Sequence, residues 1–385
     1  MRDDLSRAAT SRRRWDLFSR VVDNFGDAGI AWRLARQLTV EHKAAVTLWI
    51  DAPAVLSPLC GAPPGSLPGC HADICVRPLA EWNSAAPPPD VVVDILGHGL
   101  PPAFVGHLAG ERPAFRWFVL EYLSAEAWVE ATHGLPSPHP VSGLPRHFWF
   151  PGFTAGTGGL LREHDLFTRR DAFAADPARC RTLRHRLGVP DDARTVVSLF
   201  CYPGAPVAAL LDAWDTGDEP IACLVPEGVA VEPLAAWRAR RRDRHSPDTL
   251  SVHPVPFVAQ DRYDEMLWAS DFNFVRGEDS FVRAQWAGRP FGWNVYPQAD
   301  TAHAMKLDAF VGRYVAGLPE ALADTYLAFS RAWNGLLPAA ALAPAWRALR
   351  AARSPLASHA RAWSAQLGAL PDLAATLAAA SRTAV

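Results

Sequence analysis

Short apolar runs alternate with amphipathic stretches along the first half of the chain. The run at 45–50 is apolar apart from one threonine, and it follows a polar loop at 23–29 and a helical pattern at about 30–42. A continuously apolar run is typical of a buried strand, and a helix between two strands makes them parallel. The pattern therefore predicts a parallel sheet with strands at about 15–18, 45–50, 91–96 and 115–120.

A second series of the same kind begins near residue 194. Its apolar runs predict strands at 195–200, 221–225, 251–255, 272–275 and 291–295. Helical patterns separate them at about 205–214, 231–240, 261–269 and 280–287. This alternation predicts a second doubly wound sheet, so the expected fold class is α/β with two Rossmann-like domains.

The polar segment at about 165–190 joins the two series. We expect an N-terminal domain at 1–170 and a C-terminal domain at 185–355, and 385 residues suffice for two domains of roughly 150–200 residues. A final helix at about 356–385 is expected to pack back on the first domain. Ligands of open α/β sheets bind at the carboxyl ends of the strands, which directs attention to the loops that follow them.

Composition and charge argue against a nucleic-acid-binding, membrane-bound or secreted protein. Hydrophobic residues make up 49% of the chain, charged residues 20%, and the net charge is −2. Such a balance provides no strong positive field for nucleic acid or an anionic membrane. No apolar stretch is long enough to span a membrane, and the first residues are polar and arginine-rich rather than an apolar secretion signal. We therefore expect a cytoplasmic protein with neither nucleic acid nor membrane as partner.

The cysteines and other ligand-type residues do not form a metal-binding pattern. The six cysteines stand at 60, 70, 75, 180, 201 and 223, and no pair has the two-residue spacing of a metal knuckle or redox motif. The sequence thus predicts reduced cysteines, no metal site and no cofactor.

Two carboxylates flank Gly26 in the loop after the first predicted strand. Asp23 and Asp27 lie just before the first helix, where helix capping alone would account for either of them. The glycines at 26 and 29 do not form the dinucleotide fingerprint, and a pair of carboxylates repels phosphate. If the loop is functional, it suits a cationic acceptor better than a nucleotide.

A second polar loop, at 276–281, follows the strand predicted at 272–275 and opens the next helix. The helix N-terminus and Arg276 are suited to bind a phosphate, and Glu278 or Asp279 to accept a hydrogen bond from a ribose hydroxyl. Capping of the helix by Asp279 or Ser280 is the alternative interpretation.

Aromatic residues gather at or after the strand ends of the second half. Such rings stack on nucleotide bases, but they are equally common at the edges of a core. The residues concerned are Phe200, Tyr202, Phe257, Tyr263 and Tyr296.

Several longer segments together resemble one family, the arginine rhamnosyltransferases that modify translation elongation factor P (EarP). The segments are VVDNFGD at 21–27, WRLARQL at 32–38, LEYLSAE at 120–126, FPGF at 150–153, TGGL at 157–160, VRGEDSFVRAQW at 275–286 and YPQ at 296–298. They span most of the chain, from about residue 15 to residue 310. At two positions the chain departs from the family pattern, which has Asn in place of Val119 and Glu in place of Asp94.

The resemblance implies a GT-B fold, in which two Rossmann-like domains face each other across a cleft. It implies transfer of L-rhamnose from dTDP-β-L-rhamnose to an arginine of elongation factor P, with inversion at the sugar. The N-terminal domain would bind the acceptor and the C-terminal domain the nucleotide sugar. By position, Asp27 would be the general base and Asp23 its partner. The donor site would comprise Phe200, Tyr202, Phe257, Gln260, Tyr263, Arg276, Glu278, Asp279, Ser280, Tyr296 and Gln298.

Two alternatives stay open at this point. The chain would have the same spacing of motifs if it used another nucleotide sugar or a small-molecule acceptor. A non-catalytic protein that binds a nucleotide sugar is the other alternative, although such a protein has no need of Asp23 and Asp27.

Overall fold

The computed structural model describes residues 12–23, 25–85, 88–111, 114–241, 249–298 and 302–382. The chain divides into two compact units. Unit 1 comprises Met1–Leu123, Trp128–Glu163 and Pro371–Val385, and unit 2 comprises Ser124–Ala127 and His164–Leu370. Residues 164–170, expected in the first domain, thus belong to unit 2, and only 371–385 of the expected final helix belongs to unit 1.

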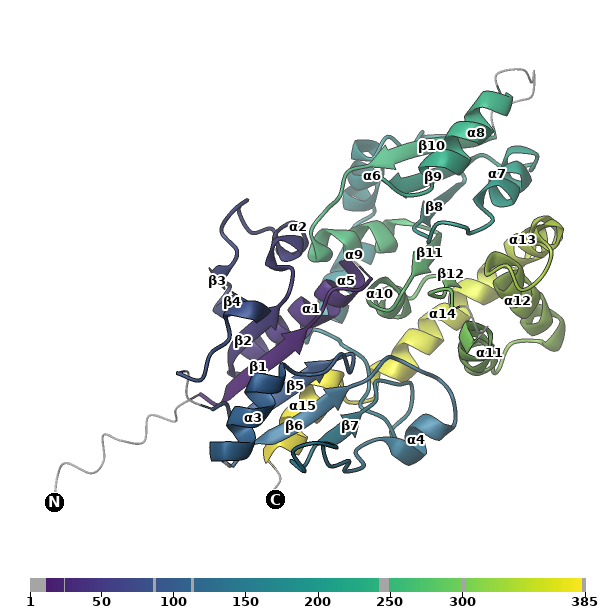
Figure 1. Cartoon of the computed structure of the whole chain (residues 1–385). Coiled ribbons are helices and arrows are strands. Elements are labelled where there is room, and N and C mark those ends of the chain that lie inside the picture. Colours follow the sequence, from purple (N-terminus) through teal and green to yellow (C-terminus); the bar gives the residue numbers. More distant parts are fainter. Residues whose placement is uncertain are drawn as a thin grey trace. The chain divides into compact units, whose positions relative to one another are not determined.

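Unit 1 contains a seven-stranded sheet in the order β3-β4-β2-β1-β5-β6-β7, with helices packed beside it (Figure 1). All neighbouring strands are parallel except β3 and β4. The strands are β1 (Arg14–Ser19), β2 (Ala45–Ile50), β3 (Gly69–His71), β4 (Ile74–Pro78), β5 (Val91–Ile95), β6 (Arg116–Leu120) and β7 (His147–Trp149). The helices are α1 (Phe25–His42), η1 (Pro53–Val55), α2 (Leu56–Cys60), η2 (Leu79–Glu81), α3 (Pro102–Glu111), α4 (Trp128–Thr132) and α15 (Leu373–Arg382).

Helix α15 closes the core of unit 1 from the far end of the sequence. Leu373, Ala374 and Leu377 are buried in the same cluster as the apolar residues of α1, β1 and β2. The Asp372 carboxylate, just before the helix, accepts a hydrogen bond from Gln37 Nε2 at 2.8 Å. The last helix is therefore an integral part of the first sheet's packing rather than a tail.

Unit 2 contains five parallel strands in the order β10-β9-β8-β11-β12. They are β8 (Thr195–Leu199), β9 (Ile221–Pro226), β10 (Leu250–Val255), β11 (Phe272–Arg276) and β12 (Phe291–Asn294). The helices are α5 (Leu166–Ala174), α6 (Pro177–Arg186), α7 (Val207–Asp215), α8 (Val231–Arg241), α9 (Gln260–Ala269), α10 (Asp279–Ala287), α11 (Ala302–Tyr314), α12 (Glu320–Trp333), η3 (Ala339–Ala341), α13 (Leu342–Ala351) and α14 (Arg353–Gly368). Two doubly wound sheets confirm the predicted α/β class.

Two features of unit 1 correct the sequence-based expectation. The pattern predicted four strands in this unit, none of them at 52–90 or near 148, whereas the structure has the β3–β4 hairpin and β7 there. β3 and β7 are the edge strands of the sheet and are only partly buried, so they lack the apolar runs that mark central strands. β4 lies between β3 and β2, but it is short and alternates buried with more exposed residues. The hairpin also brings Cys70 opposite Cys75, and the two form a disulfide where reduced cysteines were expected.

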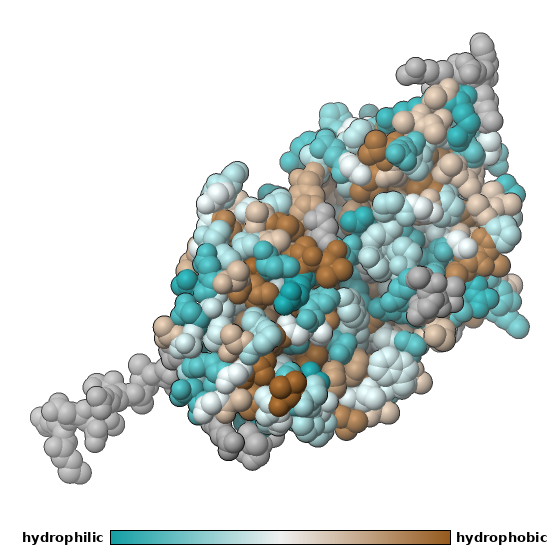
Figure 2. Space-filling model, in the orientation of Figure 1, coloured by the Kyte–Doolittle hydropathy of each residue, from teal (hydrophilic) through white to brown (hydrophobic). Residues whose placement is uncertain are grey.

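The face of the protein seen in Figure 2 has several separate apolar patches among polar residues. The exposed large apolar side chains of unit 1 include Val22, Tyr122, Trp128 and Leu135. None of the described helices is both long and apolar enough to cross a membrane.

Candidate functional site

The carboxyl edge of the unit 1 sheet has a topological switch point between β1 and β5. From β1 the chain passes through α1 to β2 on one side, whereas β5 pairs with β1 on the other side, with Phe18 opposite Asp94. Loops diverge at such a point and leave room for a ligand. The loop at 20–24 and the end of β5 therefore contribute side chains to one edge; Asn24 itself lies outside the described residues.

Asp27 lies in the first turn of α1 and is held by the loop that precedes it. Its side chain is 4% exposed, and its Oδ2 atom accepts hydrogen bonds from the backbone N–H groups of Val22 at 2.7 Å and Asp23 at 2.8 Å. No described residue donates a hydrogen bond to its other oxygen, Oδ1. The loop thus fixes the carboxylate in position and leaves one oxygen for a ligand.

Gly26 leaves space for the Asp23 carboxylate beside this loop. Its N–H donates to the carbonyl of Asp23 at 2.7 Å, which closes a tight turn. A Cβ at this position would stand 2.9 Å from Oδ2 of Asp23, so a larger residue would displace the end of that side chain. Glycine therefore lets the Asp23 carboxylate lie against the start of α1, and Asp23 and Asp27 come from a single turn.

Two further acidic residues, which the sequence analysis did not assign to the site, lie at the same edge. Asp94 near the end of β5 is 2% exposed, and Gly99 N–H donates to both of its oxygens at 3.1 and 3.2 Å. The pKa of Asp94 is raised to about 7: burial is the largest cause and the charge of Glu121 adds to it, while the Gly99 hydrogen bonds and the charges of Arg146 and Arg20 oppose the rise. Asp94 lies near the end of β5 and Glu121 directly follows the neighbouring β6, so an acidic residue at or near the end of each apolar run was the available signal.

The raised pKa of Asp94 predicts a pH-dependent stability. The ordinary pKa of an aspartate is 3.8, and that of Asp94 in the folded protein is about 7. At pH values between these two, Asp94 keeps its proton in the folded protein but has lost it in the unfolded chain. Its contribution to stability therefore falls as the pH rises through this window. We expect Asp94→Asn to remove that slope and to raise the free energy of unfolding by roughly 1–4 kcal/mol at about pH 8. Urea denaturation of the native protein and of Asp94→Asn, at about pH 5 and about pH 8, measures this difference in the free energy of unfolding.

The same substitution at the exposed Asp51, which follows β2, is the control for this experiment. Equal pH slopes in the native protein and in Asp94→Asn would show that the Asp94 carboxyl is ionised in the folded state.

At the carboxyl edge of the unit 2 sheet, Arg276 stacks against two aromatic rings. Its guanidinium carbon lies 4.5 Å from the ring centre of Phe200 and 4.8 Å from that of Tyr202. Arg276 Nη1 also donates to the carbonyl of Cys201 at 3.3 Å. Three of the predicted donor-site residues are thus in direct contact, and their contact fixes the orientation of a cationic group at the end of β11.

Two of the predicted aromatic residues expose their rings, and three are more enclosed. Phe257 is 45% and Tyr296 49% exposed, whereas Tyr202 is 6% exposed and meets Tyr296 edge-on at 5.3 Å. The Tyr263 ring contacts Phe200 edge-on at 6.2 Å, and burial raises the pKa of its hydroxyl. Partly exposed aromatic rings of this kind can stack on a planar ligand.

The polar residues that open α10 are bound to protein groups in this structure. Ser280 Oγ donates to the Arg276 carbonyl and accepts from its N–H at 3.1 Å, so it holds Arg276 rather than capping the helix. The N-cap is Glu278, without a side-chain cap. Glu278 pairs with Lys306 at 2.9 Å. The turn into the helix passes through Gly277 at φ +56°.

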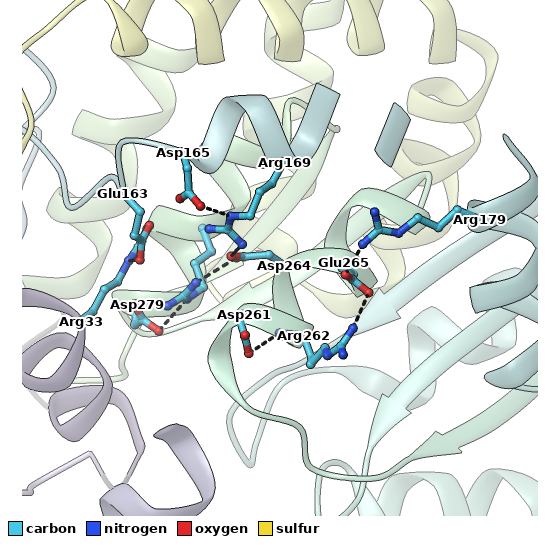
Figure 3. A network of polar contacts seen from close by, with 11 residues as sticks. Arg33, Glu163, Asp165, Arg169, Arg179, Asp261, Arg262, Asp264, Glu265 and Asp279 are labelled. Atoms are coloured by element: carbon cyan, nitrogen blue, oxygen red, sulfur yellow. Dashed lines mark hydrogen bonds and ion pairs between the residues drawn. The ribbon is translucent and has the colours of Figure 1, made fainter. Parts of the chain in front are cut away.

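Asp279 belongs to a network of buried charges. Its Oδ2 atom accepts from Arg283 Nε at 3.0 Å and Gln260 Nε2 at 3.1 Å, and Arg283 also pairs with Asp264 at 2.9 Å. Figure 3 shows Asp279 and Asp264 in this network. Asp279 and Gln260 thus stabilise the start of α10 through these contacts. The remaining predicted residue, Gln298, is exposed, and its backbone N–H donates to His303 Nδ1 at 3.3 Å.

The predicted residues therefore form two groups, each within one unit and each at the carboxyl edge of its own sheet. Unit 1 holds carboxylates at its switch point, and unit 2 holds Arg276 with the aromatic residues. Among the described residues, no group of three or more His, Cys, Asp or Glu side chains is placed to hold a metal ion.

Comparison with known proteins gives a consistent result. The family described as elongation factor P (EF-P) rhamnosyltransferase EarP matches residues 15–381. A protein-arginine rhamnosyltransferase of Pseudomonas putida is 44% identical over 370 residues, which cover 94% of this chain and 97% of that protein. The protein of the same name from Pseudomonas aeruginosa is 40% identical over 369 residues, with the same coverage of both chains.

Solved structures agree with this result. A structure concerned with EarP-mediated arginine glycosylation of translation elongation factor EF-P is 33% identical and aligns with a TM-score of 0.66 over 97% of this chain and all of that one. A glycosyltransferase from Rickettsia africae is 10% identical, with a TM-score of 0.56 over 95% of this chain and 96% of that one. The second likeness concerns the fold alone, and it is to a glycosyltransferase.

Proposed function

The chain belongs to the EF-P rhamnosyltransferase family EarP, whose members named above are protein-arginine rhamnosyltransferases, and from this premise we propose its substrates and mechanism. The donor is dTDP-β-L-rhamnose, and the acceptor is an arginine side chain of EF-P. Transfer proceeds with inversion at the anomeric carbon. The observation that carries the proposal is the group of carboxylates at the switch point of unit 1.

A guanidinium is the cation that this acidic edge suits best. Asp23 and Asp27 come from one turn, Asp94 lies near the end of β5, and Glu121 follows β6. Guanidinium groups bind carboxylates through two parallel hydrogen bonds, which fixes their plane as well as their position. Asp27, whose Oδ2 atom is already occupied by two backbone donors, presents Oδ1 to one N–H of the arginine.

The chemical difficulty of the reaction is the basicity of arginine. Its guanidinium has a pKa above about 12, so a carboxylate does not deprotonate it in the ground state. In a single displacement, the bond between a guanidinium nitrogen and the anomeric carbon forms while the bond from that carbon to dTDP breaks. Asp27 accepts the nitrogen's proton late in this step, as the positive charge on the nitrogen grows.

Negative charge develops on the departing dTDP, and unit 2 provides its stabilisation. Arg276 is held by Phe200, Tyr202 and the Ser280 hydroxyl, so it presents a fixed positive charge. The N-terminus of α10 begins three residues later and favours an anion. The exposed rings of Phe257 and Tyr296 stack on the thymine. These groups suffice without a metal ion or another cofactor.

Mass spectrometry tests the proposed reaction. Incubation with dTDP-β-L-rhamnose and folded EF-P is expected to add one deoxyhexose to the acceptor, also in excess EDTA. Replacement of the target arginine by lysine is expected to abolish the modification, because an ammonium has no planar fork to bind two carboxylates.

Three outcomes would contradict parts of this proposal. Modification of free arginine at the same rate would contradict the protein acceptor, because remote contacts with EF-P would then supply no binding energy. A requirement for Mg²⁺ would contradict metal-independent transfer. Binding of dTDP without any transfer would identify a nucleotide-sugar-binding protein instead.

A further inference from the structure

Unit 2 has a cavity at the edge of its sheet opposite to the donor-site residues. The cavity has a volume of about 370 Å³, and Arg194, Asp271 and Arg289 line it. Each of these residues stands just before a strand: β8, β11 and β12 respectively begin after them. Parallel strands begin at one edge and end at the other, so the cavity lies at the amino edge.

Strand β11 separates the cavity from the proposed donor site. Phe272, its first residue, lines the cavity, and Arg276, its last, stacks on Phe200 at the other edge. Four residues of extended chain span about 13 Å. The cavity is therefore a different place from the site that would bind dTDP-rhamnose.

Arginines dominate the polar lining of this cavity. Arg194, Arg289, Arg350 and Arg353 line it together with only two carboxylates, Glu219 and Asp271. Arg350 and Arg353 share Glu219, at 2.9 and 3.1 Å. A single carboxylate thus neutralises two guanidinium groups, and positive charge remains on this wall.

Asp271 likewise forms its hydrogen bonds and its ion pair with groups beside the cavity. Both of its oxygens accept from Arg184 Nη2 at 3.2 Å, and Oδ2 also accepts from the Val196 N–H at 2.8 Å. Arg194 has no ion pair with any described residue, and the guanidinium of Arg289 donates to the Trp268 carbonyl at 3.1 Å. With Arg184 included, five arginines stand against two carboxylates, a surplus of three positive charges.

The environment of Arg289 agrees with this surplus. Burial lowers the pKa of its guanidinium, and the charges of Arg184 and Arg361 lower it further, whereas Asp271 opposes them. A buried cation among other cations is stabilised when an anion binds beside it.

We propose that this cavity is a second anion-binding site of unit 2, which takes a small phosphorylated ligand. Arginine forks match the geometry of phosphate oxygens. A phosphate monoester carries about 1.5–2 negative charges near neutral pH, so a ligand with one or two phosphates matches the surplus better than a monocarboxylate does. The apolar side chains of Phe272, Leu349 and Leu356 complete the lining and provide a wall for an organic portion of the ligand. Cavities of this size are typical of small-molecule sites.

Calorimetric titration of the full chain with inorganic diphosphate tests the site. The double variant Arg194→Gln/Arg289→Gln is expected to weaken one binding component by at least about 10-fold. Arg347→Gln, an exposed change on α13 outside the cavity lining, is the matched control and should leave that component intact. Arg276→Gln should also leave it intact, which separates this site from the donor site.

Glu219→Gln provides a readout that structural damage would not produce. It removes the carboxylate that neutralises Arg350 and Arg353, so diphosphate is expected to bind about 3–10-fold more tightly. An isotherm that the Arg194/Arg289 double variant leaves unchanged would overturn the proposal. Diphosphate binding that Arg276→Gln abolishes completely would overturn it as well, because the anion would then bind only at the donor edge.

Discussion

Asp27→Asn is expected to lower the rate of rhamnosyl transfer by at least about 10²–10³-fold, the usual contribution of a general base. The amide keeps the size of the side chain, and its oxygen can still accept from the N–H groups of Val22 and Asp23. What it loses is the ability to take a proton from the acceptor nitrogen. Single-turnover transfer to EF-P, followed by mass spectrometry, measures the effect.

The affinity for dTDP distinguishes this role from a loss of structure. Because Asp27 belongs to unit 1 and the proposed donor residues to unit 2, dTDP should bind Asp27→Asn as it binds the native protein. Asp73→Asn is the matched control, since Asp73 is exposed in the turn between β3 and β4. Retention of more than about a tenth of native turnover by Asp27→Asn would show that another group takes the proton.

The second large effect is expected at Arg276. Loss of a charge-assisted hydrogen bond costs about 1.5–3 kcal/mol, so Arg276→Ala should weaken the binding of dTDP-rhamnose by roughly 10–150-fold. Arg276→Lys should not restore the affinity, because an ammonium lacks the flat surface that lies against Phe200 and Tyr202. Glu278→Ala is also expected to weaken binding. Calorimetry with dTDP measures these changes.

An exposed arginine of the same unit supplies the control for this series. Arg262 on α9 has a side chain that is 68% exposed, and Arg262→Ala should leave the affinity for dTDP unchanged. Unchanged affinity in both Arg276→Ala and Glu278→Ala would place the donor site away from the carboxyl edge of unit 2.

Most of the polar contacts within each predicted group could not be read from the chain. The loop at 276–281 was expected to offer its side chains to a ligand, or Asp279 or Ser280 to cap the helix. In the structure Asp279 binds Arg283 and Gln260, and Ser280 binds the backbone of Arg276. Which partner a carboxylate finds depends on neighbours brought close by α9 and α10, and spacing along one loop does not specify them.

The sequence alone determined the two α/β sheets, the family and the segments that hold the candidate residues. It did so because continuously apolar runs mark strands buried on both faces, and because long motifs are specific to one family. The tertiary structure decided which distant residues meet. It placed Asp94 and Glu121 at the same sheet edge as Asp27 and put α15 into the core of unit 1. It also formed an arginine-lined cavity at the amino edge of the unit 2 sheet, before β8, β11 and β12. Strand order and packing bring these residues together across many positions of the sequence, whereas hydrophobic periodicity reports only how each segment is buried.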